Sequence, residues 1–436
     1  MTVGTDPIEH SKTDSHAHIH PPRDEVPGLT GLRFVAAFSV LIAHGVSILL
    51  ASHETPFGAV YWLKQASGFG MTLFFVLSGF VIHYNYAIPV TQGGGRGIAA
   101  YLWARFARLY PLLLLMLVVY MLISRKHRDA WSGHPDGLMS ELIAFPYFLL
   151  SIQSWIYLPI RDSSLIYVIG AGASLTWSIS TEWFFYFVYP LLAVLILRLR
   201  RPLTIAVGVV LWCLLWTLVS TSLFDMTPKL DAFGVQHYGE IASLQTHQQD
   251  SFVRWLFYFS PYLRIGEFIL GAIVAQLYVQ LRPHPAYASE SSIGGAILAA
   301  AWVSVFVITA LMYSPYFDGG VFRKMNMNFA LGPSAAVIIF CVARYDSWVS
   351  RLLRLPWINI LGEASYSIYL THFTVIVIVA QIFGGPGHSF AYDLTMLVLT
   401  AVTIFAGSVL LHRIYEEPAR RWLRRFFGSQ KEASQR

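Results

Sequence analysis

Residues 31–52, GLRFVAAFSVLIAHGVSILLAS, form an almost unbroken apolar run near the start of the chain. About 20 such residues in a helix cross the hydrocarbon core of a bilayer, so this run predicts a transmembrane span. Only Arg33 and His44 within it are ionisable. Because ionisable groups are costly inside lipid, these two residues need either a partner or a function.

The composition of the 436-residue chain agrees with a membrane location. Hydrophobic residue types make up 56% of it and charged residues only 12%, against about 25% charged in a soluble domain. Aromatic residues reach 15%, which is typical of aromatic belts at membrane surfaces. The formal net charge of +6 comes from short basic runs between apolar segments, which indicates membrane topology and excludes nucleic acid as a partner. Cys213 and Cys341 each lie in an apolar stretch, so we expect neither a disulfide nor a metal site.

Apolar runs of similar length recur along the chain and predict an all-α polytopic transmembrane bundle of about ten spans. The predicted spans are 31–52, 68–88, 106–123, 176–197, 202–222, 258–279, 292–313, 328–345, 357–380 and 392–412. A further apolar run, 141–156, is shorter and contains Pro146, so it is predicted to be re-entrant or interfacial rather than an eleventh span. With ten spans both termini are cytoplasmic, and most basic residues of the connecting segments lie on that side, as the positive-inside rule requires.

The chain divides into one membrane domain with a polar segment at each end. Residues 1–27 are rich in Pro and His and are predicted to be a disordered cytoplasmic tail, since they cannot bury enough apolar surface. Residues 28–424 form the membrane domain, and residues 425–436 form a second cytoplasmic tail. No cleavable signal peptide precedes the first span, so that span is expected to serve as the insertion signal.

Arg33 and His44 lie on one face of the first predicted helix. Eleven residues at 100° each return to within about 20° of the same direction and advance about 16 Å. Arg33 is therefore expected at the cytoplasmic interface, where an arginine can simply extend to the headgroups, and His44 near mid-membrane. A neutral imidazole there can take a proton from a hydroxyl group. Burial as a packed residue is the alternative.

Two arginines lie at the cytoplasmic end of the third span, in the stretch YLWARFARLYP (101–111). Arg105 and Arg108 are three residues apart and share a helical face. Their planar, permanently charged guanidinium groups suit phosphate recognition. Anchoring by the positive-inside rule explains them equally well.

The fourth span opens with LTWSISTEWFFYFVYP (175–190) and carries an acidic residue one to two turns from the outer face. Glu182 there needs a histidine, arginine or hydroxyl partner, and Trp177, Ser178 and Ser180 precede it. It either orients an imidazole, shares a proton with one, or belongs to a structural pair.

Two later spans also contain ionisable or hydroxyl side chains. In SPYLRIGEFILGA (260–272), Arg264 and Glu267 are spaced to pair within one helix, which favours a structural role. In INILGEASYSIYLTHFTV (358–375), hydroxyl groups such as that of Tyr366 can join helices. His372 in the same stretch is expected either to line the outer half of a polar cavity or to be packed.

Taken together, these strings resemble the acyltransferase-3 family of integral membrane acyltransferases. The resemblance covers about residues 28–424 and rests on seven strings in order: GLTGLRFVAAFSVLIAHG, FGMTLFFVLSGFVI, ARFARLYP, LTWSISTEWFFYFVYPLL, LRIGEFILGA, LGEASYSIYLTHF and YEEPARRW. It implies that His44, in the Arg-x10-His pair with Arg33, is catalytic. It also implies that Arg105 and Arg108 engage an acyl-CoA, and we expect the phosphates of this donor to bind Arg105, Arg108 and Arg33. Many relatives carry an appended hydrolase-like domain, and this chain is expected to act without one.

The family's Trp-Ser-x-Ser-x-Glu element falls on Trp177, Ser178, Ser180 and Glu182. Here the chain departs from the common form, with Thr181 before the glutamate and Trp183 after it. That departure bears on the choice of acceptor rather than on the chemistry.

The resemblance implies an O-acyltransferase of the cytoplasmic (inner) membrane. Acyl-CoA, most commonly acetyl-CoA, is the expected donor, and a carbohydrate or glycosylated hydroxyl is the expected acceptor. His44 then acts as general base or as transient acyl carrier, with Glu182 orienting it in the base route. The competing interpretations are a transporter or flippase, since intramembrane His, Glu and Arg also mark substrate paths, and a membrane scaffold without chemistry. No inverted repeat supports the transporter, and a scaffold leaves His44 and Glu182 unexplained.

Overall fold

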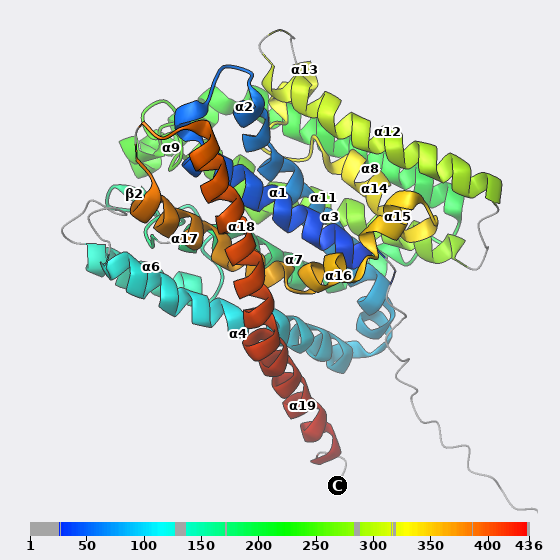
Figure 1. Cartoon of the computed structure of the whole chain (residues 1–436). Coiled ribbons are helices and arrows are strands. Elements are labelled where there is room, and N and C mark those ends of the chain that lie inside the picture. Colours follow the sequence, from blue (N-terminus) through cyan, green and yellow to red (C-terminus); the bar gives the residue numbers. More distant parts are fainter. Residues whose placement is uncertain are drawn as a thin grey trace, which may run out of the picture.

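The computed structural model describes residues 26, 28–126, 137–170, 172–282, 288–314, 316, 320–385 and 387–433. The predicted N-terminal tail, residues 1–27, lies outside the described residues apart from Val26. At the other end, a helix continues through the predicted tail 425–436 as far as Ala433. The described chain is mostly helical, as predicted (Figure 1). The only strands in these ranges are two strands of two residues each, which pair with each other.

The helices and strands follow one another along the chain, and short 3-10 or π-helical segments among them are labelled η. In chain order, the first part comprises α1 (Leu29–Leu49), η1 (Ala51–His53), α2 (Ala59–Lys64), α3 (Ala66–Gln92), α4 (Gly94–Lys126), α6 (Gly137–Leu149), β1 (Pro159–Ile160), β2 (Ser163–Ser164), η2 (Ala173–Thr176), α7 (Trp177–Ile196), α8 (Pro202–Asp225), α9 (Thr227–Tyr238), η3 (Glu240–Ala242), α10 (Phe252–Arg254), η4 (Trp255–Phe259) and α11 (Pro261–Leu281). The remainder are α12 (Ala288–Tyr313), α13 (Gly320–Lys324), α14 (Gly332–Arg344), α15 (Trp348–Leu353), α16 (Pro356–Glu363), α17 (Ser365–Phe383), α18 (Phe390–Leu411), η5 (His412–Glu416) and α19 (Glu417–Ala433).

Within the described ranges, nine helical stretches are long and apolar enough to cross a membrane. They correspond to nine of the ten predicted spans, so the prediction of an all-α polytopic bundle is confirmed. The exception is 328–345. There the chain forms turns through Met325–Leu331, with Phe329 at a positive φ of 57°, and α14 keeps only 13 residues. At 1.5 Å per residue such a helix covers about 20 Å, less than the roughly 30 Å hydrocarbon core.

Two other predicted segments differ in detail from the helices that form. The predicted span 357–380 is broken at Ala364 into α16 and α17. The apolar run 141–156 forms α6, which ends at Leu149 after 13 residues and is followed by turns rather than further helix. This short α6 agrees with the prediction of a re-entrant or interfacial segment.

Helices α3 and α11 form the centre of the bundle and approach each other through glycines. A Cβ on Gly79 would lie 1.9 Å from the carbonyl oxygen of Phe268, and one on Gly271 would lie 1.9 Å from that of Val76. Small residues permit this close packing between membrane helices. In the apolar window of the stretch that contains α11, 78% of the residues are buried, whereas in that of α8 only 11% are buried. The α8 surface therefore faces the lipid.

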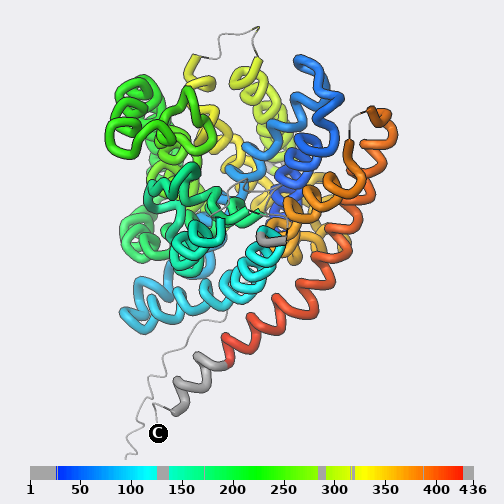
Figure 2. Tube along the Cα trace, turned by 90° about the vertical axis from the view of Figure 1, so that its left-hand side faces the viewer, coloured from blue at the N-terminus to red at the C-terminus, as the bar shows by residue number. Residues whose placement is uncertain are grey.

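Helix α1 packs against α3 on one side and against α16 and α17 on another (Figure 1). Helices α18 and α19 run on through η5 as one long helix along the side of the bundle (Figure 2). The indole Nε1 of Trp103 donates to the carbonyl oxygen of Leu423 at 2.9 Å and ties α19 to α4. This arrangement brings α1, α3, α4, α7 and α17 together around the candidate site.

Candidate active site

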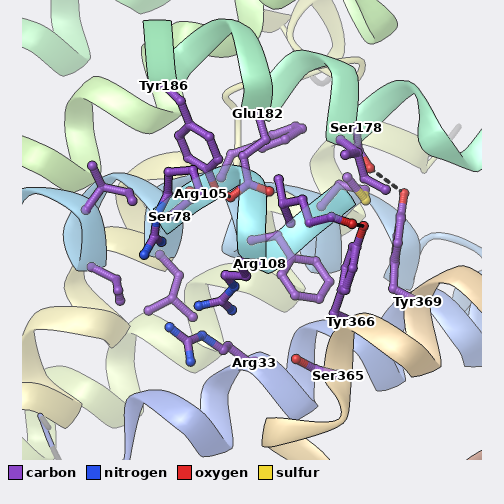
Figure 3. Close-up of a pocket in the computed structure, with 18 residues that line it drawn as sticks. Arg33, Ser78, Arg105, Arg108, Ser178, Glu182, Tyr186, Ser365, Tyr366 and Tyr369 are labelled. Carbon is purple, nitrogen blue, oxygen red and sulfur yellow. Dashed lines mark hydrogen bonds between the residues drawn. The ribbon is translucent and has the colours of Figure 1, made fainter. Parts of the chain in front are cut away.

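A pocket opens among α1, α3, α4, α7 and α17 and gathers most of the predicted polar residues (Figure 3). Its empty space amounts to about 760 Å³, which includes open solvent at its mouth. We call it the arginine pocket. Its polar lining consists of Arg33, Ser78, Arg105, Arg108, Ser178, Glu182, Tyr186, Ser365, Tyr366 and Tyr369.

The three arginines predicted to bind the donor all line the arginine pocket. Arg33, Arg105 and Arg108 lie within electrostatic range of one another. The Nη2 of Arg105 donates to the hydroxyl of Tyr86 at 2.5 Å, and the guanidinium lies 4.6 Å from the centre of that ring. Its Nε is buried and has no hydrogen-bond partner among the residues that the structure describes. Because gathered like charges and an unsatisfied buried donor are both costly, the pocket suits a bound anion such as a phosphate.

Glu182 lies in the same pocket, where one carboxylate oxygen accepts two hydrogen bonds. The hydroxyl of Ser78 donates to it at 2.6 Å, and that of Tyr186, one turn further along α7, at 2.5 Å. Sequence reasoning missed both partners, although the four-residue spacing of Glu182 and Tyr186 is a readable signal. Glu182 is therefore a component of the arginine pocket, and its described hydrogen bonds do not include one to His44.

His44 instead contacts His372 of α17. The Nδ1 of His44 lies 2.9 Å from the Nε2 of His372, and the two ring planes are nearly parallel, with centroids 5.2 Å apart. On the far side of His372, Nδ1 lies 2.7 Å from the carbonyl oxygen of Tyr369 and 3.2 Å from that of Ile368. His372 is completely buried. The two predicted histidines thus form one pair between α1 and α17, although neither lines the arginine pocket.

Tyr369 connects the arginine pocket to this histidine pair. It lines the pocket, and its hydroxyl accepts from Ser178 at 2.8 Å and donates to the carbonyl oxygen of Leu175 at 3.0 Å. Its ring centroid is 5.8 Å from that of His372, one turn further along α17. The side chain of Tyr369 therefore separates the arginine pocket from the histidine pair.

A second pocket lies on the other side of the pair, around the β1–β2 hairpin and the start of α6. Its lining combines charged, amide and hydroxyl groups with the aromatic ring of Phe373: Gly137, Ser140, Ile160, Arg161, Asp162, Ser163, Tyr167, Val168, Ile169, Gly170, Gly172, Ser174, Gln249, Asp250, Phe373 and Val377. The ring of Phe373 meets that of His44 edge-on, with centroids 5.4 Å apart. Burial raises the pKa of Tyr167 to about 12, so its hydroxyl stays protonated. We call this second cavity the hairpin pocket.

Trp177 and Ser180 line neither pocket. The ring of Trp177 packs against those of Tyr258 and Phe259 at centroid distances of 5.1 and 5.2 Å. The hydroxyl of Ser180 accepts from the backbone and side chain of Ser154 at 3.1 and 2.9 Å. These two residues hold the start of α7 against its neighbours, and of the motif only Ser178 and Glu182 line a pocket.

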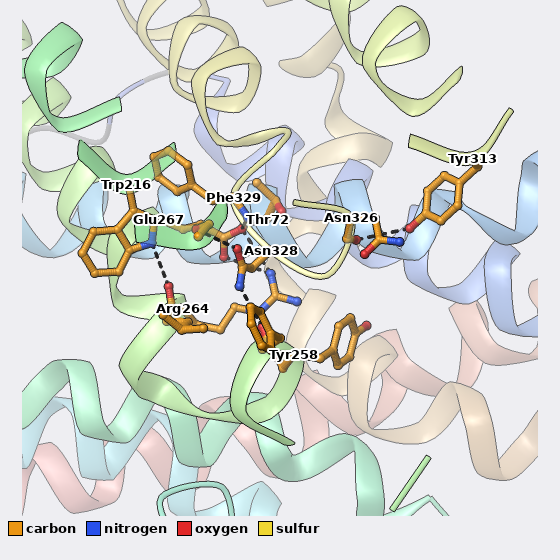
Figure 4. A network of polar contacts seen from close by, with 12 residues as sticks. Thr72, Trp216, Tyr258, Arg264, Glu267, Tyr313, Asn326, Asn328 and Phe329 are labelled. Carbon is orange, nitrogen blue, oxygen red and sulfur yellow. Dashed lines mark hydrogen bonds and ion pairs between the residues drawn. The ribbon is translucent and has the colours of Figure 1, made fainter. Parts of the chain in front are cut away.

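The predicted pairing of Arg264 and Glu267 within α11 is confirmed, with Nη1 and Oε1 3.2 Å apart and both side chains buried (Figure 4). The same carboxylate accepts from the hydroxyl of Thr72 at 2.8 Å and from the backbone N–H of Phe329 at 3.1 Å. The Nε of Arg264 donates to the carbonyl oxygen of Tyr258 at 2.9 Å. The pair lines neither pocket and joins α3, α11 and the turn before α14.

Within the part of the chain that the structure describes, no group of three or more His, Cys, Asp or Glu side chains is arranged to hold a metal ion. The described residues place a buried imidazole pair close to an arginine-lined pocket. The nine apolar helical stretches among them indicate an integral membrane protein.

Comparison with known proteins gives the family. Residues 26–413 match the profile of the family described as Acyltransferase domain, and the chain belongs to this acyltransferase-3 family of membrane enzymes. Acyltransferase MdmB of Streptomyces mycarofaciens is 27% identical over 418 residues, which cover 93% of this chain and 94% of that protein. No solved structure matches the chain significantly.

Other relatives are longer than this chain. A putative O-acetyltransferase of Staphylococcus aureus (strain COL) is 22% identical, over 91% of this chain and 57% of its own length. Peptidoglycan O-acetyltransferase OatA of Listeria monocytogenes is 22% identical, over 83% of this chain and 51% of its own length. The chain thus spans nearly all of MdmB and little more than half of these two proteins. As a member of the family, it is an acyltransferase.

Proposed function

We propose that this enzyme moves an acyl group, most simply acetyl, from acyl-CoA to a hydroxyl of a carbohydrate or glycosylated acceptor. The observation that carries the proposal is the order of groups along α1 and α17. An arginine pocket ends at Tyr369, the His44–His372 pair follows, and the hairpin pocket begins at Phe373. Donor and acceptor then approach one histidine from opposite sides.

The donor's phosphates bind in the arginine pocket. Three guanidinium groups and the unsatisfied Nε of Arg105 offer donors of the number and geometry that phosphate oxygens accept. Arg33 and His44 are about 16 Å apart along α1, so phosphates at the Arg33 end leave the thioester arm to extend toward the imidazole. Because Tyr369 lies between the arginine pocket and the histidine pair, its side chain moves aside when the thioester reaches His44.

The acceptor binds in the hairpin pocket. Asp162, Gln249 and Asp250 line it together with the protonated Tyr167, and such a mixture of donors and acceptors suits a polyhydroxylated molecule. The edge contact of Phe373 with His44 supports this route, because a hydroxyl passing that ring meets the imidazole. The names of relatives, among them a peptidoglycan O-acetyltransferase, agree with a carbohydrate acceptor.

In the direct route, the imidazole of His44 takes the proton of the acceptor hydroxyl as its oxygen attacks the thioester carbonyl carbon. The carbon–sulfur bond breaks, and the departing thiolate receives that proton, so the products are the ester and free CoA. In the two-step route, the imidazole nitrogen attacks the thioester carbonyl carbon first and the carbon–sulfur bond breaks, which gives an acyl-imidazolium and the CoA thiolate. The acceptor oxygen then takes the acyl group as the carbon–nitrogen bond breaks, and the proton of the acceptor hydroxyl goes to the thiolate, so the products are again the ester and free CoA. Glu182 serves in both routes by offsetting the charge of the arginines and holding Ser78 and Tyr186.

The orientation of the protein in the membrane follows from the side on which the donor is found. Acyl-CoA is a cytosolic metabolite, so the Arg33 end of α1 faces the cytoplasm and the hairpin pocket faces outward. The segment from Met325 to Arg344 also returns across the bundle, although α14 is short: Asn326 accepts from Tyr313 at the far end of α12, and Arg344 donates to Leu281 at the end of α11. With this tenth crossing, both termini are cytoplasmic. The excess of basic residues in the segments on the Arg33 side supports the same orientation.

The test is transfer of radiolabel by the purified full chain reconstituted in liposomes. Radiolabelled acetyl-CoA is supplied with a panel of sugars, glycosylated metabolites and peptidoglycan fragments, and labelled products are separated. His44→Ala should abolish transfer. His237→Ala, which removes an exposed histidine of α9, should leave it unchanged, and both variants should insert equally.

Two results would count against the proposal. Full transfer by His44→Ala removes the histidine from the chemistry. Absence of transfer from acyl-CoA, together with transfer from a membrane-borne acyl donor, rejects the cytosolic donor.

A further inference from the structure

The hydrogen bonds around His372 leave only one proton arrangement for a neutral histidine pair. Carbonyl oxygens only accept hydrogen bonds. The Nδ1 of His372, 2.7 Å from the carbonyl oxygen of Tyr369, therefore carries the hydrogen. In a neutral imidazole the other nitrogen then has no hydrogen and accepts, and here that nitrogen faces His44.

The same reasoning determines where the hydrogen of His44 lies. Its Nδ1 lies 2.9 Å from the Nε2 of His372, which has only a lone pair to offer. The Nδ1 of His44 must therefore carry the hydrogen and donate it. The remaining nitrogen, Nε2, keeps its lone pair and makes no hydrogen bond among the described residues.

We propose that His372 is a positioning residue that fixes His44 as its Nδ1–H tautomer and thereby presents the Nε2 lone pair to the reacting groups. The inference rests on the proposed function and deepens it by naming the nitrogen that reacts. It holds for either route, since both proton abstraction and attack on the thioester require a lone pair on the reacting nitrogen.

His372 also stabilises what forms on His44. When Nε2 takes a proton or an acyl group, His44 becomes positively charged, and its Nδ1–H then donates a charge-assisted hydrogen bond to His372. The backbone carbonyls of Tyr369 and Ile368 lie at the far end of this chain of hydrogen bonds and stabilise positive charge passed along it. The proton returns to the thiolate from Nε2 in the direct route, so His372 ends each cycle neutral.

The geometry is rigid enough for this role. His372 is fully buried in the middle of α17, and the rings of the two histidines are nearly parallel, with an interplanar angle of 9°. Phe373 closes a second side of the His44 ring at 85°. Because these contacts determine the orientation of both imidazoles, the exchange of the two nitrogens of His44 by ring rotation is opposed.

The experiment compares His372→Leu, His372→Gln and His53→Leu in reconstituted protein. Leucine leaves the Nδ1–H of His44 without an acceptor, whereas the amide oxygen of glutamine restores one. His53→Leu is the matched control, because it removes another histidine that hydrogen-bonds across helices, to Asp393 at 2.8 Å. In serine proteases, loss of the group that fixes the histidine tautomer costs about 10⁴-fold in rate.

We expect His372→Leu to lower kcat by about 10²-fold or more, with the KM for acyl-CoA within about twofold of wild type because the arginine pocket is intact. His372→Gln should recover at least about a tenth of the wild-type kcat, which is a single tenfold loss. Nitrogen NMR of wild-type protein labelled in its histidine rings, assigned with the His44→Ala spectrum, should show the hydrogen of His44 on Nδ1.

A kcat for His372→Leu within about threefold of wild type, or an Nε2–H tautomer of His44, would overturn the inference. Equal losses in His372→Leu and His372→Gln would do the same. If His372→Leu does not fold, the NMR measurement on the wild-type protein and the kinetics of His372→Gln decide. A transfer-competent His44→Ala would instead reject the proposed function, so the two failures are distinguishable.

Discussion

Replacing the paired arginines of α4 by alanine should weaken donor binding more than it slows the chemistry. Arg105 and Arg108 line the same pocket, and Arg105 has a buried Nε with no partner. A hydrogen bond to a charged group contributes about 1.5–3 kcal/mol, and a bidentate guanidinium contact belongs to the stronger end of that range. Each substitution should therefore raise the KM for acyl-CoA about 10–100-fold.

Steady-state kinetics on the reconstituted enzyme at varied acyl-CoA and saturating acceptor would measure this change. Arg96→Ala is the matched control, since it removes an exposed arginine of the same helix that does not line the pocket. Arg105→Lys should give an intermediate KM, because lysine keeps the charge and loses the planar fork. Protease accessibility of the C-terminus should be identical in all variants, which separates ligand binding from membrane orientation.

One outcome would refute the reasoning. If the double variant Arg105→Ala with Arg108→Ala has an unchanged KM and a normal orientation, the arginines serve topology rather than the donor. A change of orientation with normal KM in the correctly oriented fraction leads to the same conclusion.

Three further predictions concern charge and packing. Glu182→Gln should lower the KM for acyl-CoA, because it removes the negative charge among the arginines, and a raised KM in the kinetic assay would contradict that role. Glu267→Leu should cost about 3–5 kcal/mol of unfolding free energy in detergent by leaving its arginine uncompensated, whereas Lys64→Ala, at a partly exposed ion pair, should cost about 1 kcal/mol or less. Gly79→Ala should destabilise the fold, since its Cβ would lie 1.9 Å from a backbone oxygen of α11, whereas Gly208→Ala meets open space and should stabilise α8 by up to about 1 kcal/mol. Melting curves would fail to support the packing argument if both glycine variants behaved alike.

The long spans could be predicted because apolar length alone decides whether a helix crosses a bilayer. The length of the helix within 328–345 and the break within 357–380 could not be predicted. Whether 328–345 forms one helix depends on the turns through Met325–Leu331, and these are held by tertiary contacts such as the bond from the backbone N–H of Phe329 to Glu267. The break at Ala364 has no proline or glycine to mark it, since Gly362 lies within α16, where its missing side chain admits the backbone of Thr30.

Spacing along one helix predicts local relationships in the site and misses those between helices. The shared face of Arg33 and His44, and the Arg264–Glu267 pair, follow from helical geometry. The approach of His44 to His372 spans 328 positions and leaves no local pattern. The sequence interpretation pairs Glu182 with His44 by analogy with the carboxylate of a catalytic triad, yet its hydroxyl partners come from α3 and α7.

The choice of a histidine rather than a carboxylate beside His44 has a physical reason. A carboxylate in mid-membrane must be desolvated in every resting molecule, which costs several kcal/mol unless it is fully paired. A neutral imidazole accepts the same hydrogen bond without that permanent charge, and its own hydrogen is satisfied within α17 by the carbonyl oxygen of Tyr369. Charge then exists at the pair only while a proton or acyl group is on His44. Glu182, by contrast, lies among arginines that compensate it. In the proposed mechanism, the lasting charges are therefore confined to the arginine pocket, and His44 is neutral between turnovers.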